Sequence, residues 1–288
     1  MNTRPLRMSD VMSAFPEFQL GERPLGEGGM KSAFHILGED QRVLKIIREP
    51  LPDEALEGAV SLPERIRREI EGMRAISHPR IVEIVDGPDV RPVGENSYVW
   101  YSEPFFSGGT LADHLGTPWP ESKCRDLISD LVDAADVLAQ NKVVHRDIKP
   151  TNIVFDESDR PVLLDLGIAY FQDLTPLTEH WGQSPKTPTY AAPEQFDFRM
   201  NASIDFRTDL FQIGIVAFEA MTGSHPFNPT DPEGYIERLS KGNYDRSALC
   251  DTNVSVGMQR VLGRLLSASV SRRYRKFEHL REALEECQ

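Results

Sequence analysis

The sequence is poor in cysteine and lacks long apolar runs. Its three cysteines, Cys124, Cys250 and Cys287, are far apart and odd in number. They form neither a disulfide framework nor a zinc-binding spacing, and such usage is typical of a reducing cytosol. No stretch reaches the about 18 consecutive apolar residues of a transmembrane helix, and the N-terminal MNTRPLRMSDVMSAF lacks the apolar segment of a secretory signal. We therefore expect a cytoplasmic protein with no membrane partner.

Positive charge is also scarce. The 32 Lys and Arg residues are outnumbered by 45 Asp and Glu residues, which gives a net charge of −13. So acidic a chain is poorly suited to coating the phosphates of DNA or RNA, and we expect no nucleic-acid partner. Its 288 residues are enough for one large domain or for two lobes with separate cores.

The character of the chain changes partway along. Residues 20–48 contain short apolar segments broken by glycine, which indicate strands and turns, and the segment 62–76 has helical spacing. After SGGTL (107–111) the pattern is mainly helical, apart from two short apolar runs, NIVF and PVLLDL. We therefore predict an α+β fold with a β-rich N-terminal lobe over 18–104 and a mainly helical C-terminal lobe over 105–288. Residues 1–17 carry no readable motif and are expected to form an extension.

The most specific motif is VVHRDIKPTNIVF, residues 143–155. It contains Asp147, Lys149 and Asn152, and Asp165 follows directly after the PVLL run. Two oxygen donors from such a set can hold Mg²⁺, which prefers hard oxygen ligands and keeps phosphates as partners. The other aspartate stays free to accept a proton from an incoming hydroxyl. Taken singly, Asp147 is equally a loop-capping residue and Asp165 a turn residue.

HRDIKPTN and DLG together resemble the catalytic loop and the D-F-G motif of the protein kinase family, with Leu in place of Phe. The resemblance spans nearly the whole chain and implies a bilobal, eukaryotic-like serine/threonine kinase that transfers the γ-phosphate of ATP to a protein hydroxyl. It implies that Asp147 is the catalytic base and that Lys149 neutralises the moving phosphoryl group. Asn152 and Asp165 would bind Mg²⁺, and Mn²⁺ suits the same oxygen donors.

The resemblance also implies an ion pair in the N-terminal lobe. RVLKII supplies Lys45, and the segment before HPRIV supplies Glu69. Glu69 lies at helical spacing from Ile66 and Met73, so it projects near the buried face, where an unpaired charge is costly. Lys45 is the natural partner for Glu69. Taken alone, each is also explained as an exposed charge.

The segment LGEGGMK resembles the glycine-rich loop over the ATP phosphates, with Lys31 in place of the third glycine. The Lys31 ammonium either helps to hold phosphate or points to solvent. Ala33 replaces the usual Val on adenine, and Val43 replaces the usual Ala. Residues implied to bind ATP are Gly26, Glu27, Gly28, Gly29, Lys31, Ala33, Val43, Lys45, Glu103, Phe105 and Val154.

YVWYSEPFF aligns with the segment that links the two lobes in the family. Without a gap, Glu103 falls at the gatekeeper position, whereas a one-residue insertion would make Ser102 the gatekeeper. Both alignments remain open. In either case adenine would bond to main-chain groups near Phe105.

The later motifs complete the resemblance. Glu194 of AAPE would pair with Arg273, although two separate surface charges are the alternative. Thr187 corresponds to the threonine that contacts the catalytic Asp and Lys in serine/threonine kinases, and Asp209 to the buried Asp that anchors the catalytic loop.

Arg146, next to Asp147, suggests regulation, because a guanidinium can bind a phosphorylated loop residue with two hydrogen bonds. The candidates, which are explained equally well as polar residues of a solvated loop, are Thr175, Thr178 and Ser184. Phosphorylation by a second copy of the kinase would require transient self-association.

Two other functions compete with an active protein kinase. A pseudokinase that serves as a nucleotide-binding scaffold is favoured by Lys31, Val43 and the acidic gatekeeper, and opposed by the intact catalytic set. A small-molecule phosphotransferase is opposed by the A-P-E segment and by Arg146. An active serine/threonine protein kinase therefore accounts best for the sequence.

Overall fold

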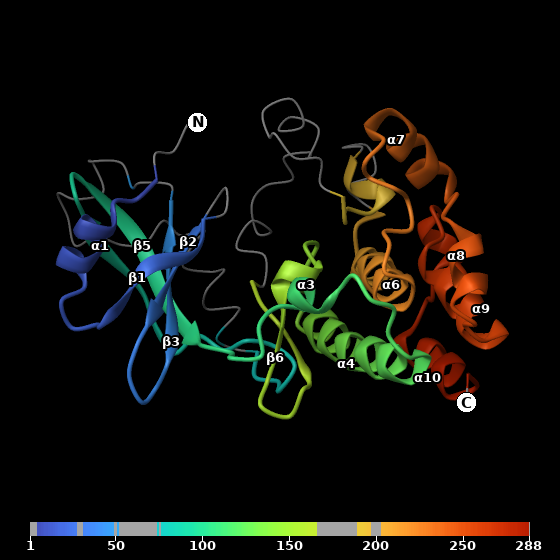
Figure 1. The fold of residues 1–288 in the computed structure, drawn as a ribbon, viewed down its shortest axis with the longest axis horizontal. Coiled ribbons are helices and arrows are strands. Elements are labelled where there is room, and N and C mark those ends of the chain that lie inside the picture. Colours follow the sequence, from blue (N-terminus) through green and yellow to red (C-terminus); the bar gives the residue numbers. More distant parts are fainter. Residues whose placement is uncertain are drawn as a thin grey trace. The chain divides into compact units, whose positions relative to one another are not determined.

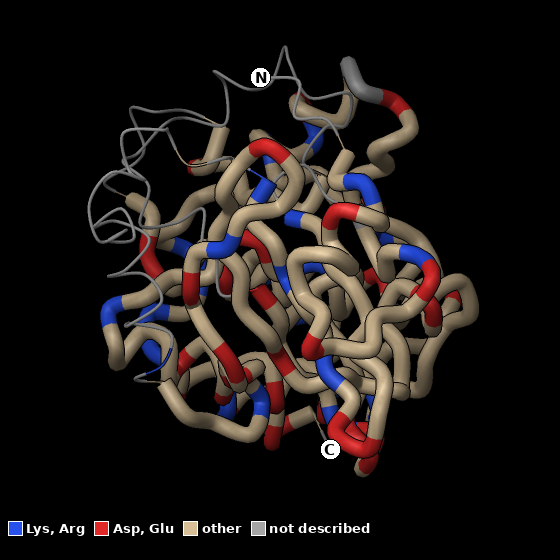
Figure 2. The backbone as a smooth tube through the Cα atoms, turned by 90° about the vertical axis from the view of Figure 1, so that its left-hand side faces the viewer, with Lys and Arg blue, Asp and Glu red and all other residues tan. Residues whose placement is uncertain are grey.

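The computed structural model describes residues 5–27, 31–48, 51, 74, 76–165, 189–196 and 203–287. The chain divides into two compact units (Figure 1): residues 1–77 with 82–106, and residues 78–81 with 107–288. The first contains an antiparallel sheet and the second is mainly helical, which confirms the expected α+β class. Residues of both charges, Lys and Arg as well as Asp and Glu, are scattered along the described backbone (Figure 2).

The sheet of the first unit has five strands in the order β1-β2-β3-β5-β4. Each strand pairs antiparallel with its neighbours. The expected strand segments in 20–48 correspond to the first three strands. The strands are β1 Leu20–Glu27, β2 Lys31–Ile36, β3 Arg42–Ile47, β4 Asp86–Val93 and β5 Asn96–Pro104. Most of the helix expected over 62–76 lies outside the described residues.

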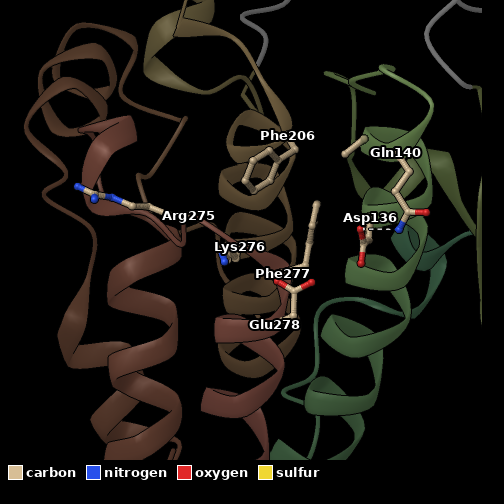
Figure 3. A pocket seen from close by; sticks show the side chains of 8 residues that line it. Asp136, Gln140, Phe206, Arg275, Lys276, Phe277 and Glu278 are labelled. Atoms are coloured by element: carbon tan, nitrogen blue, oxygen red, sulfur yellow. Dashed lines mark hydrogen bonds between the residues drawn. The ribbon is translucent and has the colours of Figure 1, made fainter.

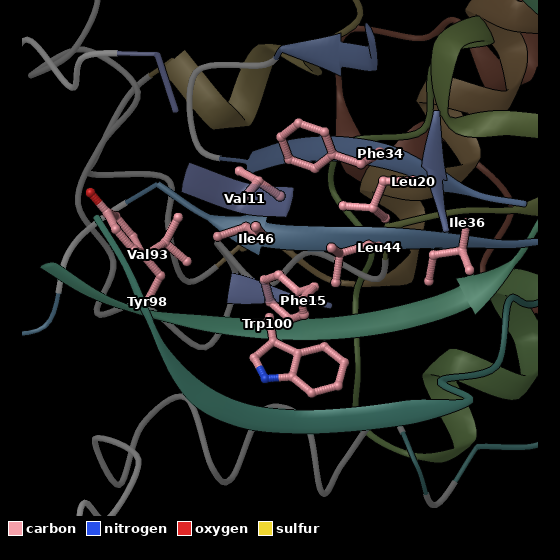
Figure 4. Close-up of a cluster of buried hydrophobic side chains, with 10 residues drawn as sticks. All are labelled: Val11, Phe15, Leu20, Phe34, Ile36, Leu44, Ile46, Val93, Tyr98 and Trp100. Carbon is pink, nitrogen blue, oxygen red and sulfur yellow. The ribbon is translucent and has the colours of Figure 1, made fainter. Parts of the chain in front are cut away.

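One face of this sheet forms the core of the first unit (Figure 4). Side chains alternate between the two faces of a strand, so Phe34, Leu44, Ile46 and Trp100 share this face, where they form a buried cluster. The opposite face carries the intervening residues, including Lys45. The sheet therefore has an apolar face for stability and a second face that is free to carry charge.

The segment expected to be an N-terminal extension contributes to this core. It forms helix α1, Met8–Ala14, which buries Val11. Phe15 follows directly, is fully buried, and meets the Trp100 ring edge-on at 5.2 Å. The Arg91 guanidinium lies 4.6 Å from the centre of the Phe15 ring. Residues 8–15 are thus an integral part of the first unit.

The second unit is built around a buried helix, α6, Phe206–Thr222. The apolar run FQIGIVAFEAMTG predicts a helix buried nearly all round, and α6 indeed buries both apolar and polar residues along its length. It starts at Asp205, whose side chain accepts a hydrogen bond from the Arg207 amide, and ends at Gly223 with φ of 73°. The α-helices around it are α3 Leu111–His114, α4 Glu121–Gln140, α7 Pro232–Lys241, α8 Arg246–Asp251, α9 Val256–Leu265 and α10 Phe277–Glu285.

The described part of the second unit also contains a short β ribbon and turns of 3₁₀ helix. The ribbon pairs β6, Ile153–Phe155, with β7, Pro161–Leu163, at the two apolar runs noted in the sequence. Residues 78–81 join this unit because Ile81 bridges to Leu163 and the Leu163 amide donates to the Arg80 carbonyl. The 3₁₀ turns are η2 Pro150–Asn152, η3 Pro193–Phe196 and η5 Val270–Arg272.

Candidate active site

Helix α6 holds the loop that precedes η2 through hydrogen bonds. Asp209 is fully buried, and its two carboxylate oxygens accept hydrogen bonds from the amides of His145 (2.9 Å) and Arg146 (2.8 Å). The Ile148 amide donates to Gln212 Oε1 at 2.9 Å. Arg146 has a positive φ of 62°, a conformation that a side chain other than glycine adopts at a cost. The buried helix therefore fixes the loop in a strained shape.

Burial changes the pKa of Asp209, the α6 residue that binds the loop. It raises the pKa of Asp209 to about 7, against the lowering effect of the two backbone amides. Burial also lowers the pKa of His145, whose ring nitrogen Nε2 lies 2.9 Å from the Leu164 carbonyl. The His145 ring is therefore neutral and links the loop to the end of β7.

Two predicted catalytic residues, Asp147 and Lys149, meet the predicted metal ligand Asn152 here. The Lys149 ammonium donates to both carboxylate oxygens of Asp147, at 3.0 and 2.7 Å. Asn152 Nδ2 donates to the Asp147 carbonyl at 2.8 Å and to its carboxylate at 2.9 Å. The Asp147 carboxylate remains half exposed, with 54% of its side chain accessible. It is thus oriented by two donors while one side stays open to solvent.

The same geometry leaves an oxygen for a metal. Because the amide nitrogen of Asn152 is committed to Asp147, its amide oxygen points the other way. The Asn152 carbonyl accepts from the Leu164 amide at 2.8 Å, which ties η2 to the residue before Asp165. An amide oxygen and a carboxylate form a donor set that suits Mg²⁺. Among the described residues no three His, Cys, Asp or Glu side chains form a metal-binding group, so phosphates and water would complete the shell.

The first unit contains an ion pair that sequence reasoning missed. Lys45 Nζ lies 2.7 Å from Glu103 Oε2, and the two side chains are only 7% and 2% exposed. The strand register explains the pairing: Val43 lies opposite Glu103 and Lys45 opposite Tyr101, so Lys45 and Glu103 share one face of the sheet. Glu69, the partner expected from the resemblance, lies outside the described residues. Side chains alternate between the two faces of each strand, which is the sequence signal for this pair. It shows that Lys45 and Glu103 share a face only once the pairing of β3 with β5 is known.

The register also separates the two gatekeeper candidates. Ser102 lies opposite Leu44, on the face of the buried core, and its hydroxyl donates to Asp86 at 2.6 Å. Glu103 lies on the face that carries Lys45. The geometry therefore favours Glu103 at the gatekeeper position.

Other candidate nucleotide-binding residues lie on the face that carries Lys45. Ala33 lies directly opposite Lys45, and Lys31 has its ammonium 5.7 Å from the centre of the Tyr101 ring. Gly26 pairs with Ala33 near the end of β1.

Two further candidate ATP-binding residues, Phe105 and Val154, lie outside the strands that carry Lys45 and its neighbours. The Phe105 amide is already used, since it donates to the Gln41 carbonyl at 3.0 Å. This amide is therefore not free to bind a ligand. Val154, in the second unit, is buried in β6.

The expected pair of Glu194 and Arg273 forms with two hydrogen bonds. Arg273 Nη1 and Nη2 lie 2.6 and 2.8 Å from the two Glu194 oxygens, and both side chains are fully buried. Thr208 donates to Glu194 at 2.7 Å, and the guanidinium lies 4.5 Å from the centre of the Phe211 ring. A buried pair with this many partners ties η3 to the segment after α9.

Two glutamines have positions that the sequence did not reveal. Gln195 Nε2 and Gln212 Nε2 both donate to the Arg146 carbonyl, at 3.0 and 2.7 Å. Gln195 Oε1 also accepts from the Ala192 amide. These buried amides hold the residue before Asp147 from two elements, η3 and α6. A lone glutamine has no spacing pattern, so only the tertiary structure identifies them.

Several candidates cannot be placed. Residues outside the described part of the chain are Gly28, Gly29, Glu69, Thr175, Thr178, Ser184 and Thr187, and the side chain of Glu27 is likewise not described.

A surface pocket on the second unit has no part in this chemistry (Figure 3). It lies at the ends of α4, α6 and α10 and carries charges of both signs, Asp136 and Glu278 with Arg275 and Lys276. Asp136 is held by Gln140 at 3.0 Å and by Arg281 at 2.8 Å. The pocket is lined by none of the candidate catalytic residues.

Within the described residues, no helix is long and apolar enough to cross a bilayer.

Comparison with known proteins agrees with this geometry. A family model described as "Protein kinase domain" matches residues 21–284. The serine/threonine-protein kinase PknB of Mycobacterium tuberculosis is 31% identical over 239 residues, covering 80% of this chain and 35% of that protein. The serine/threonine-protein kinase pkn2 of Myxococcus xanthus is 29% identical over 272 residues, covering 91% of this chain and 31% of that protein.

The chain therefore spans about a third of the length of these curated relatives. Among solved structures, Rad53 1–466 in complex with AMP-PNP superposes with a TM-score of 0.71 at 21% identity, covering 94% of this chain and 64% of that one. This likeness supports the fold. Since the family model covers most of its length, the chain belongs to the protein kinase family, as the catalytic-loop and D-L-G motifs predict.

Proposed function

We propose that this protein is an active serine/threonine protein kinase that transfers the γ-phosphate of ATP to a hydroxyl of a protein substrate. The observation that carries the proposal is the hydrogen-bonded set of Asp147, Lys149 and Asn152. Relatives at about 30% identity named serine/threonine-protein kinases support the same activity. The set matches what phosphoryl transfer needs, which is positioning and charge stabilisation rather than covalent chemistry.

The roles follow from the chemistry of each group. Asp147 would orient the substrate hydroxyl and accept its proton, because its carboxylate is open on one side. Lys149, bound to Asp147 in this structure, would move to the transferring phosphoryl group and offset its charge. Asn152 and Asp165 would hold Mg²⁺, which neutralises charge on the β- and γ-phosphates when bound.

Lys45 would contact the α- and β-phosphates. The Lys45 side chain is only 7% exposed and its ammonium lies 2.7 Å from Glu103 Oε2, which fixes its direction. The proposal assigns the glycine-rich loop, with Gly26, Gly28 and Gly29, to the phosphates, and Ala33, Val43, Phe105 and Val154 to the adenine.

The competing functions are less well supported. A pseudokinase would not need Asp147 oriented by two donors, and a small-molecule phosphotransferase would not need the buried pair of Glu194 and Arg273. We also propose a cytoplasmic location, which the free cysteines Cys124, Cys250 and Cys287 support. Transient self-association during autophosphorylation and the absence of a nucleic-acid partner are proposed on the sequence motifs and the net charge of −13.

The test is transfer of label from [γ-³²P]ATP with Mg²⁺ to the protein itself and to a generic protein substrate, followed by mass spectrometry. Incorporation on Ser or Thr that is lost in Asp147→Asn is the expected result. Asp133→Asn, a change of the same kind at an exposed site paired with Arg281, is the matched control and should keep full activity. Binding of ATP without any transfer by the wild-type protein would show a pseudokinase instead.

A further inference from the structure

A groove of about 770 Å³ on the second unit is strongly basic. It lies where the end of α7, the start of α8, the end of α9 and the segments η3 and η5 meet. We call it the basic groove and define it by four cationic residues that line it, Lys241, Arg246, Arg264 and Arg272. Its volume lies within the roughly 300–1,000 Å³ of typical ligand sites.

The charge of the groove is exceptional for this protein. Among the described residues that line it, none is Asp or Glu. The whole chain has a net charge of −13, and charges of both signs are scattered along the described backbone (Figure 2). The pocket of Figure 3 shows the ordinary pattern, in which Asp136 and Glu278 balance Arg275 and Lys276. None of the lining residues is acidic, and Lys241 alone of the four cations is paired with a carboxylate of the described residues, so the groove attracts an anion.

The three arginines are available to a ligand. Lys241 is paired with Glu237 at 2.6 Å, but Arg246, Arg264 and Arg272 form no ion pair with any described residue and are exposed. The Arg246 guanidinium lies 5.2 Å from the centre of the Tyr244 ring, and that of Arg264 lies 4.1 Å from the centre of the Tyr274 ring. Stacking of this kind restrains a guanidinium while its N–H groups remain free to donate.

The groove is connected to the catalytic loop through η3. Pro193 and Phe196 line the groove. Between them, Glu194 binds Arg273, the neighbour of Arg272, and Gln195 donates to the carbonyl of Arg146. A ligand in the groove would therefore contact the same short segment that supports the residue before Asp147.

We propose that the basic groove binds a phosphorylated serine or threonine in a peptide segment of a protein substrate. Phosphate is favoured over carboxylate because its larger negative charge and three acceptor oxygens suit a groove lined by three arginines, and the hydroxyl-bearing Ser267 and Ser269 also line the groove. A polypeptide is favoured over a nucleic acid because the chain as a whole is acidic. The inference rests on the proposed function, since a protein kinase meets polypeptides that carry this phosphate. It makes the enzyme selective for substrates that are already phosphorylated at a second position.

The test is a binding measurement that needs no catalysis. The probe is a fluorescein-labelled decapeptide with one phosphoserine among degenerate positions, titrated with the Asp147→Asn protein in the absence of ATP and followed by fluorescence anisotropy. The phosphopeptide should bind at least about tenfold more tightly than the same peptide with serine, because the dianion supplies the charge-assisted bonds. The triple variant R246Q/R264Q/R272Q should lose at least about tenfold in affinity for the same reason.

Two further variants control this result. R260Q/R275Q/K276Q removes the same charge from exposed sites outside the groove and should bind as the parent protein does. R246K/R264K/R272K keeps the charge but not the forks, and should bind about threefold or more weakly than the parent, yet more tightly than the glutamine variant. The lysine variant also retains long side chains at all three sites, so it tests recognition without emptying the groove.

The inference is overturned if phosphorylated and unphosphorylated peptides bind equally, or if both charge-removing triple variants lose the same affinity. It is also overturned if a single-stranded oligonucleotide binds more tightly than the phosphopeptide and only the groove variant loses it. These outcomes do not depend on phosphoryl transfer. A protein that binds the phosphopeptide but transfers no phosphate would refute the proposed function and leave the groove assignment standing.

Discussion

The ion pair between Lys45 and Glu103 predicts a large effect from removing one partner. Both side chains are more than nine-tenths buried and their charged atoms lie 2.7 Å apart. Replacing Glu103 with leucine removes the carboxylate that lies against the Lys45 ammonium, and losing one partner of a buried pair typically costs about 3–5 kcal/mol. We therefore expect Glu103→Leu to lower the free energy of unfolding by about 3 kcal/mol or more.

The double variant Lys45→Met/Glu103→Leu shows whether the loss of stability comes from the broken ion pair or from the loss of either side chain. Replacing both partners with apolar residues of similar size is often neutral or stabilising, so the double variant should recover most of the loss. Such non-additivity measures the coupling directly. The assay is urea unfolding followed by tryptophan fluorescence, because Trp100 lies in the core of the same unit.

The matched control is the exposed pair of Lys241 and Glu237, whose side chains are 59% and 65% accessible. Glu237→Gln should leave the unfolding midpoint unchanged, since exposed pairs contribute little. The reasoning is refuted if Glu103→Leu unfolds at the same urea concentration as the wild type, or if the double variant is as unstable as the sum of the two single variants. Kinase activity should be lost in the single variant Lys45→Met and in the double variant, and reduced in Glu103→Leu alone.

Three further predictions concern the two cores and the loop anchor. Arg273→Ala should destabilise the protein by about 3–5 kcal/mol in thermal or urea unfolding, because it strands the fully buried Glu194; a change below 1 kcal/mol would contradict the role of the pair. Phe15→Ala should cost about 3–5 kcal/mol by leaving a cavity against Trp100, whereas an unchanged stability would mean that α1 does not pack on the sheet in solution. Folding raises the pKa of Asp209 from 3.8 to about 7, so the folded state binds the proton more tightly and this group's contribution to stability falls as pH rises from 4 to 7. Asp209→Asn should flatten that part of the pH–stability curve, and an identical slope in both proteins would count against the assignment.

The candidate catalytic set was predictable from the sequence to the extent that its members are close in the chain. Asp147, Lys149 and Asn152 lie within six positions, so a short motif brings them together whatever the rest of the fold does. The helix α6 was also predictable, because a run that is apolar on all sides can only be buried. The pairing of Glu194 with Arg273, 79 residues apart, was anticipated only through the resemblance to the family.

What the sequence could not decide depends on long-range register and packing. Lys45 meets Glu103 because β3 pairs with β5, and a shift by one residue would have placed Ser102 on that face instead. Phe15 joins the core because the sheet offers Trp100, a contact between residues 85 positions apart that local periodicity does not encode. The basic groove is made from five separate elements, and the three arginines that line it show no common spacing. Local spacing thus determined which residues carry the chemistry, while strand register and helix packing decided what holds them and which surfaces stand beside them.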